Sequence, residues 1–224
     1  MVLLTRSLKY LRKNWLRIVA HAGSLVPLAW LIWQYSQGAF LIDPIREITT
    51  LTGRTALILL LLSLACTPLS TLTGFRGVVR VRRALGLYAF LYVGLHFFTF
   101  VWLDYRLDLK MLQQAILDQR YVLVGLAAGL ILLALALTST KGWQKRLGKN
   151  WKRLHRWVYL AGILAVVHFL WLVKDIRLPL RYAAVLAALL LLRLPPVRRG
   201  ISRTRRRLVA SWRQRRTNAD ATSS

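Results

Sequence analysis

The residues best suited to chemistry in this chain are its four histidines, His21, His96, His155 and His168. His96 and His168 lie deep inside long apolar stretches, where an ionisable side chain is costly and by default raises a functional question. Imidazole is a common metal ligand, and two imidazoles facing each other from two helices are what a six-coordinate b-type haem needs. These two histidines are therefore the first candidates for a functional site.

The composition indicates the environment in which these histidines work. The chain has 224 residues, of which 56% are hydrophobic, yet its formal net charge is +27. A soluble domain cannot hide that much apolar surface, and long uncharged runs are not typical of nucleic-acid binders. An integral membrane protein reconciles the two properties, with the lipid bilayer and not nucleic acid as its partner. The single cysteine, Cys66, excludes an internal disulfide, a Cys-based zinc site, an iron–sulfur cluster and covalent C-x-x-C-H haem attachment.

Six apolar segments could position the histidines. They lie at about 16–35, 51–70, 84–103, 120–139, 155–173 and 179–194. As helices they have the length and polarity expected of bilayer-spanning segments. The first resembles part of a signal peptide, but no small-x-small cleavage site follows Trp33 and five more segments come after it, so we interpret it as a retained span. The sequence predicts an all-α integral membrane protein, a six-transmembrane-helix bundle formed by residues 16–195.

The distribution of charge predicts the orientation of this bundle. If the six segments alternate, 26 of the 34 Lys and Arg residues fall on the side that holds both termini. Because loops rich in Lys and Arg stay in the cytoplasm, both termini are expected to be cytoplasmic. Residues 1–15 would then form a basic cytoplasmic N-terminus, and residues 196–224 an Arg-rich cytoplasmic tail.

The depth of His96 and His168 is the most useful measurement. Each lies about 13 residues from the cytoplasmic entrance of its span, or about 20 Å into a core of about 30 Å. The two should therefore share one level, in the half of the bilayer nearer the outside. Gly94 and Gly162 would leave room for a flat macrocycle. We predict that His96 and His168 are the axial ligands of the iron of a haem b.

Two other interpretations of His96 and His168 belong to different functional classes. One is a proton or metal transporter that uses the intramembrane histidines as relay groups. The other is a membrane anchor in which the histidines only pack between helices. A purified transporter without haem would be colourless, whereas a protein that holds haem absorbs visible light.

His155 has several possible roles. Thirteen helical residues turn 220° beyond three full turns, so His155 and His168 do not lie on one stripe and cannot serve the same porphyrin. His155 could bind a second haem with His21 as partner, line a quinone or flavin site, or be a structural interfacial residue. Four arginines bracket this cytoplasmic entrance and could pair with haem propionates or a flavin phosphate, although membrane anchoring explains most of them: Arg82, Arg83, Arg153 and Arg156.

Several short segments of the chain form a familiar set. They are G-R-T-A-L (53–57), T-P-L (67–69), R-R-A-L-G-L (82–87), L-H (95–96), L-T-S-T (137–140), L-G-K-N-W-K-R-L-H-R-W-V-Y (147–159) and H-F-L-W (168–171). These segments resemble the MsrQ family, formerly YedZ, within the ferric-reductase-like transmembrane family, and the resemblance covers residues from about 10 to 200. The run through His155 and His168 is the most specific part.

This resemblance implies a b-type cytochrome, also described as binding FMN, in a bacterial inner membrane. The family's ligand histidines fall on His96, His155 and His168. The resemblance implies that electrons come from the quinone pool. A cytoplasmic flavin reductase is the alternative electron donor. The resemblance also implies that the electrons go to a periplasmic MsrP-like molybdopterin subunit that reduces methionine sulfoxide in oxidised proteins. The chain itself would be an electron-transfer subunit rather than the catalytic one, and the loop 104–119 could dock the partner. One histidine in the third span puts a full second haem in doubt.

Overall fold

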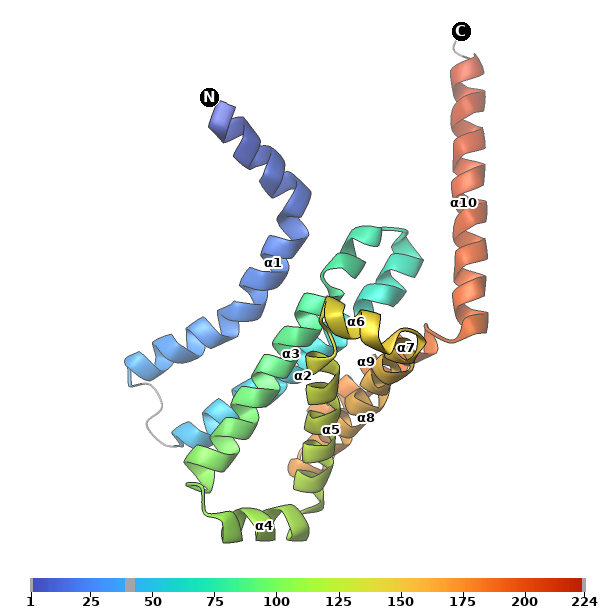
Figure 1. Ribbon diagram of the computed structural model, residues 1–224. Coiled ribbons are helices and arrows are strands. Elements are labelled where there is room, and N and C mark those ends of the chain that lie inside the picture. Colours follow the sequence, from blue (N-terminus) through green and yellow to red (C-terminus); the bar gives the residue numbers. More distant parts are fainter. Residues whose placement is uncertain (1, 39–42, 223–224) are drawn as a thin grey trace.

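The computed structural model describes residues 2–38 and 43–222 (Figure 1). Over these residues the chain is helical and contains no strand. The α-helices are α1 (Val2–Ser36), α2 (Pro44–Thr73), α3 (Arg82–Phe98), α4 (Leu109–Asp118), α5 (Arg120–Leu137), α6 (Lys141–Leu147), α7 (Lys149–Leu154), α8 (Val158–Leu172), α9 (Arg177–Leu191) and α10 (Pro195–Thr222). Short helical turns cover Arg76–Arg80 and His155–Trp157, and a π-helix covers Thr99–Asp104. The prediction of an all-α protein is confirmed.

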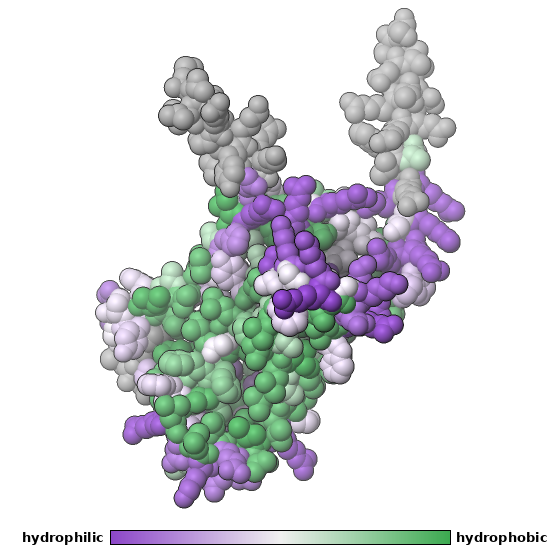
Figure 2. All heavy atoms as spheres, in the orientation of Figure 1, coloured by the Kyte–Doolittle hydropathy of each residue, from purple (hydrophilic) through white to green (hydrophobic). Residues whose placement is uncertain are grey.

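Five helical segments are long and apolar enough to cross a membrane. They are Asn14–Ser36, Pro44–Thr73, Arg82–Asp104, Arg120–Leu137 and Lys149–Leu172. A sixth exists only if α9 and the first part of α10, which are bent by 72° at their junction, are taken as one span. Figure 2 shows a wide apolar band with polar residues gathered at its two ends. The count of six and the cytoplasmic termini remain predictions.

Helix α2 is the centre of the bundle. Its apolar stretch is 56% buried, whereas those of the other four spans are 11–22% buried. Asp43 caps its first turn by accepting a hydrogen bond from the Arg46 backbone N–H, and Pro44 supplies the first helical residue, where its missing N–H costs nothing. Gly74 ends the helix in the left-handed conformation, with φ at 79°. Helices α3, α8 and α9 all pack on α2.

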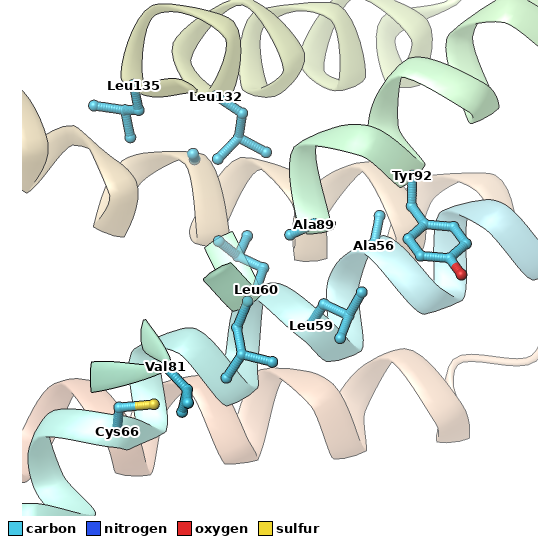
Figure 3. Packing of buried hydrophobic residues seen from close by; sticks show 11 residues of the cluster. Ala56, Leu59, Leu60, Cys66, Val81, Ala89, Tyr92, Leu132 and Leu135 are labelled. Atoms are coloured by element: carbon cyan, nitrogen blue, oxygen red, sulfur yellow. The ribbon is translucent and has the colours of Figure 1, made fainter. Parts of the chain in front are cut away.

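Two helix pairs form the core around the histidines. Helix α2 packs mainly against α3, and α5 packs mainly against α8. Small and branched side chains form a buried cluster where the pairs meet, and Figure 3 shows Ala56, Ala89 and Leu132 among them. Ala89 and Ala161 are completely buried. Because small residues let helix backbones approach closely, the two pairs can meet along their length.

Candidate haem-binding site

The two intramembrane histidines meet inside the bundle. His96 comes from α3 and His168 from α8, and their ring centroids are 6.2 Å apart. The planes of the two rings cross at 87°. The two rings are therefore neighbours in the bundle, as the equal helical rise from each entrance predicts. Their depth in the bilayer stays a prediction.

Each of these rings is held by a backbone carbonyl. The Nδ1 of His96 lies 2.9 Å from the Thr49 carbonyl oxygen, and the Nδ1 of His168 lies 2.7 Å from the Tyr121 carbonyl oxygen. A carbonyl can only accept, so each Nδ1 carries the proton and donates it. Neither ring has a second hydrogen bond within the part of the chain that the structure describes. Each Nε2 is therefore an unprotonated lone-pair donor, the form that ligates a metal ion.

This donor set fits haem iron. Because a bond from a metal ion to an imidazole nitrogen is about 2 Å long, two imidazoles on opposite sides of one ion have ring centres about 6 Å apart. The separation of 6.2 Å between His96 and His168 meets that requirement. A metal-ligating histidine usually donates its other ring N–H to a carbonyl or carboxylate, as both rings do here. The two side chains could thus hold the iron of one haem b from opposite faces.

Sequence reasoning did not find the carbonyls of Thr49 and Tyr121. Main-chain oxygens leave no signature in residue types, and each lies 47 residues from its histidine. The two glycines singled out from the sequence differ in their surroundings. A Cβ on Gly162 would make ordinary contacts with Leu186 and Leu64, so the space beside this glycine is occupied by side chains, and the prediction that it leaves room for a macrocycle is wrong. A Cβ on Gly94 would meet open space.

His155 lies in a separate cluster at the end of α7. Its Nε2 is 3.3 Å from the Thr138 hydroxyl, and its ring packs on Trp151 with centroids 4.1 Å apart. The Trp151 indole N–H in turn donates to the Thr138 carbonyl over 2.9 Å. The short 3₁₀ turn at His155–Trp157 separates this cluster from α8. His155 and His168 therefore have different neighbours, and the role of His155 in a second haem, quinone or flavin site stays a prediction.

His21 projects from α1 toward α3. Its Nδ1 is 2.9 Å from the Tyr88 hydroxyl, and the side chain is otherwise exposed on the bundle surface. No hydrogen bond or ring contact joins His21 to His155 within the described residues. The structure thus gives the two histidines different partners and does not bring them together as a ligand pair.

The four candidate anion-binding arginines differ in burial. Arg82 is half-buried, and its Nη1 lies 3.4 Å from the Thr67 hydroxyl. Arg83, Arg153 and Arg156 are exposed. A further arginine was missed: Arg193 donates from Nη1 to the Tyr159 hydroxyl over 2.7 Å and from Nη2 to the Leu64 carbonyl. Arg193 follows the end of α9 and belongs to no motif, so nothing in the sequence marked it.

Comparison with known proteins places this chain in a family. Residues 52–166 match the family model described as ferric reductase like transmembrane component. The chain is 48% identical over 181 residues to the protein-methionine-sulfoxide reductase heme-binding subunit MsrQ of Xanthomonas axonopodis pv. citri, which covers 78% of this chain and 83% of that relative. The MsrQ subunits of Xanthomonas euvesicatoria and Xanthomonas campestris match over the same shares at the same identity. The chain belongs to the MsrQ family.

Membership in the MsrQ family agrees with the apolar helices, which are those of a multi-pass membrane protein. The ferric reductase match contains His96 and His155 and ends two residues before His168. The relatives are named as haem-binding subunits, and the paired imidazoles are the part of this MsrQ-family chain that could bind haem. No solved structure matches this chain significantly.

Proposed function

We propose that this protein transfers electrons across the bacterial inner membrane with a haem b held by His96 and His168. The observation that carries the proposal is the pair of imidazoles 6.2 Å apart, each with its Nδ1 proton directed to a carbonyl. Bound haem supplies reversible one-electron chemistry. The protein's part is to orient both Nε2 lone pairs and to surround them with apolar helices that exclude water.

The acceptor in this proposal is a periplasmic MsrP-like molybdopterin subunit that reduces methionine sulfoxide in oxidised proteins. The relatives are named as subunits of a protein-methionine-sulfoxide reductase, which supports a separate catalytic partner. The amphipathic helix α4, between the third and fourth spans, is a candidate docking surface, with exposed Leu109, Met111 and Leu117. FMN is proposed from family resemblance, and Arg82, Arg83, Arg153 and Arg156 remain candidates for its phosphate.

Absorption spectra of the detergent-purified protein test the haem assignment. We expect a Soret band and an α-band that sharpens on reduction with dithionite, together with haem extracted in proportion to protein. Haem per chain distinguishes one site from two, the second involving His155. A purified, folded protein without these bands would contradict the proposal and favour the alternative, a proton or metal transporter that uses the same histidines as relays.

Quinol is the proposed electron donor, with a cytoplasmic flavin reductase as the other candidate. His21 supports quinol entry, because its exposed ring lies on the outer surface of the bundle, where a lipid-soluble donor can reach it, with Nδ1 oriented by Tyr88. Tyr88 is eight residues from His96 on α3, or about 12 Å along the helix. Loss of one hydrogen bond to the donor, about 1.4 kcal/mol, corresponds to about a tenfold effect.

We therefore expect His21→Gln to slow haem reduction by a water-insoluble quinol about tenfold, without changing haem content or reduction by dithionite. Stopped-flow absorbance in proteoliposomes measures both rates. His155→Gln is the matched variant at the alternative entry site. If only His155→Gln slows the quinol reaction, quinol enters at the cluster of His155, Thr138 and Trp151 instead.

A further inference from the structure

The two halves of the histidine site are built alike. Thr49 and Tyr121, the carbonyl partners, are 72 residues apart, and so are His96 and His168. The same offset relates the helix pair α2 and α3 to the pair α5 and α8. Eight identical pairs fall on it in these segments: Leu51 and Leu123, Gly53 and Gly125, Ala56 and Ala128, Leu60 and Leu132, Leu61 and Leu133, Ala89 and Ala161, His96 and His168, and Phe97 and Phe169. The two helix pairs thus carry the same residues at several equivalent positions, the glycines and histidines of the site among them.

Burial follows this offset at the positions nearest the core. Ala89 and Ala161 both have 0% exposure. Ala56 and Ala128 are 6% and 4% exposed, and Leu60 and Leu132 are 2% and 6% exposed. Toward the bundle surface the match is lost, since Leu61 is 6% exposed and Leu133 is 37% exposed.

A glycine stands against each imidazole. A Cβ on Gly53 would lie 3.0 Å from Nδ1 of His96, and a Cβ on Gly125 would lie 2.7 Å from Nδ1 of His168. Each glycine is four residues after the carbonyl that its histidine contacts. Side chains on a helix lean toward the N-terminus, so the residue at i+4 covers the carbonyl of residue i. A glycine there leaves the second lone pair of that carbonyl open to the imidazole.

We propose that Gly53 and Gly125 are positioning residues for the two histidines. By uncovering the carbonyls of Thr49 and Tyr121, they let each ring donate its Nδ1 proton and present Nε2 to the centre of the site. They also fix the rotation of each ring, and so the crossing angle of 87° between the planes. This inference rests on the proposed haem site and adds the groups that set its ligand orientation.

Gly125→Ala and Gly53→Ala test this role in the full-length protein. Outer-shell partners of metal ligands typically change metal affinity by 10- to 100-fold, and we expect a loss of haem retention in that range, larger for Gly125→Ala because its contact is closer. Gly129→Ala, one turn further along α5, is the control, since its Cβ would make an ordinary contact of 3.6 Å with Val93. Circular dichroism and gel filtration establish that each variant is folded.

Electron paramagnetic resonance adds a measurement that a merely structural role would not change. Perpendicular axial imidazoles give low-spin ferric haem a more anisotropic signal than parallel ones, so the wild type should show the anisotropic form. Haem that remains in Gly53→Ala should show a shifted signal, while Gly129→Ala keeps that of the wild type. If Gly53→Ala and Gly125→Ala are folded, retain haem as the wild type does and show its signal, the positioning role is overturned while the proposed haem site stands. A wild type without haem would overturn the proposed function, and the inference with it.

Discussion

Replacement of His168 or His96 by alanine is expected to remove most of the haem from the purified protein. Each side chain supplies one of two imidazoles whose ring centroids lie 6.2 Å apart, and one imidazole cannot fill both ligand positions. A loss of a ligand exceeds the 10- to 100-fold effect of losing an outer-shell partner, so less than about a tenth of the haem should remain. Any haem that stays is left with one protein ligand, and its Soret and α-bands should change shape.

Haem extraction and absorption spectra measure this result. His155→Ala is the matched control, because His155 lies in a separate cluster with Thr138 and Trp151. It should leave the spectrum of the His96–His168 site intact, and it also reports a second haem if the total content falls by half. A full complement of six-coordinate haem in either His96→Ala or His168→Ala would refute the ligand assignment.

Replacement of Tyr92 by alanine is expected to cause the largest loss of stability among changes outside the site. Tyr92 is 1% exposed and is one of the largest completely buried side chains. Its hydroxyl donates to the Ser24 carbonyl over 2.7 Å and accepts from the Leu28 N–H over 3.0 Å, which fastens α1 to α3. Truncating a buried aromatic ring costs about 3–5 kcal/mol, to which the lost hydrogen bonds add.

Thermal unfolding in detergent measures the loss of stability in Tyr92→Ala. Tyr92→Phe separates the hydroxyl from the ring and should lose only about 1 kcal/mol per hydrogen bond. Tyr35→Ala is the control on α1, because that side chain is 71% exposed and its removal creates no cavity. Equal melting temperatures for Tyr92→Ala and Tyr35→Ala would show that this contact does not hold α1 to the bundle.

The offset of 72 residues shows why Gly53 and Gly125 could not be recognised as site residues from the sequence. No repeat with a period of 20–50 residues is evident, and the offset of 72 residues is carried by a few residues among abundant Leu and Ala. Gly53 and Gly125 carry no mark that separates them from the other glycines in apolar helices. Their role depends on which helix lies opposite, because a glycine matters only where its missing Cβ faces another group.

Local patterns in the sequence were enough to predict the class of the protein and the pairing of its two central histidines. Apolar runs and their helical rise are local properties, so they predicted an all-α membrane protein and placed His96 and His168 at one level. The groups that those imidazoles meet are visible only in the folded bundle: they are the carbonyls of Thr49 and Tyr121, 47 residues away in each case. It also gave His21 and His155 separate neighbours. Such pairings depend on how helices rotate and pack against one another, which residue spacing along a single helix does not specify.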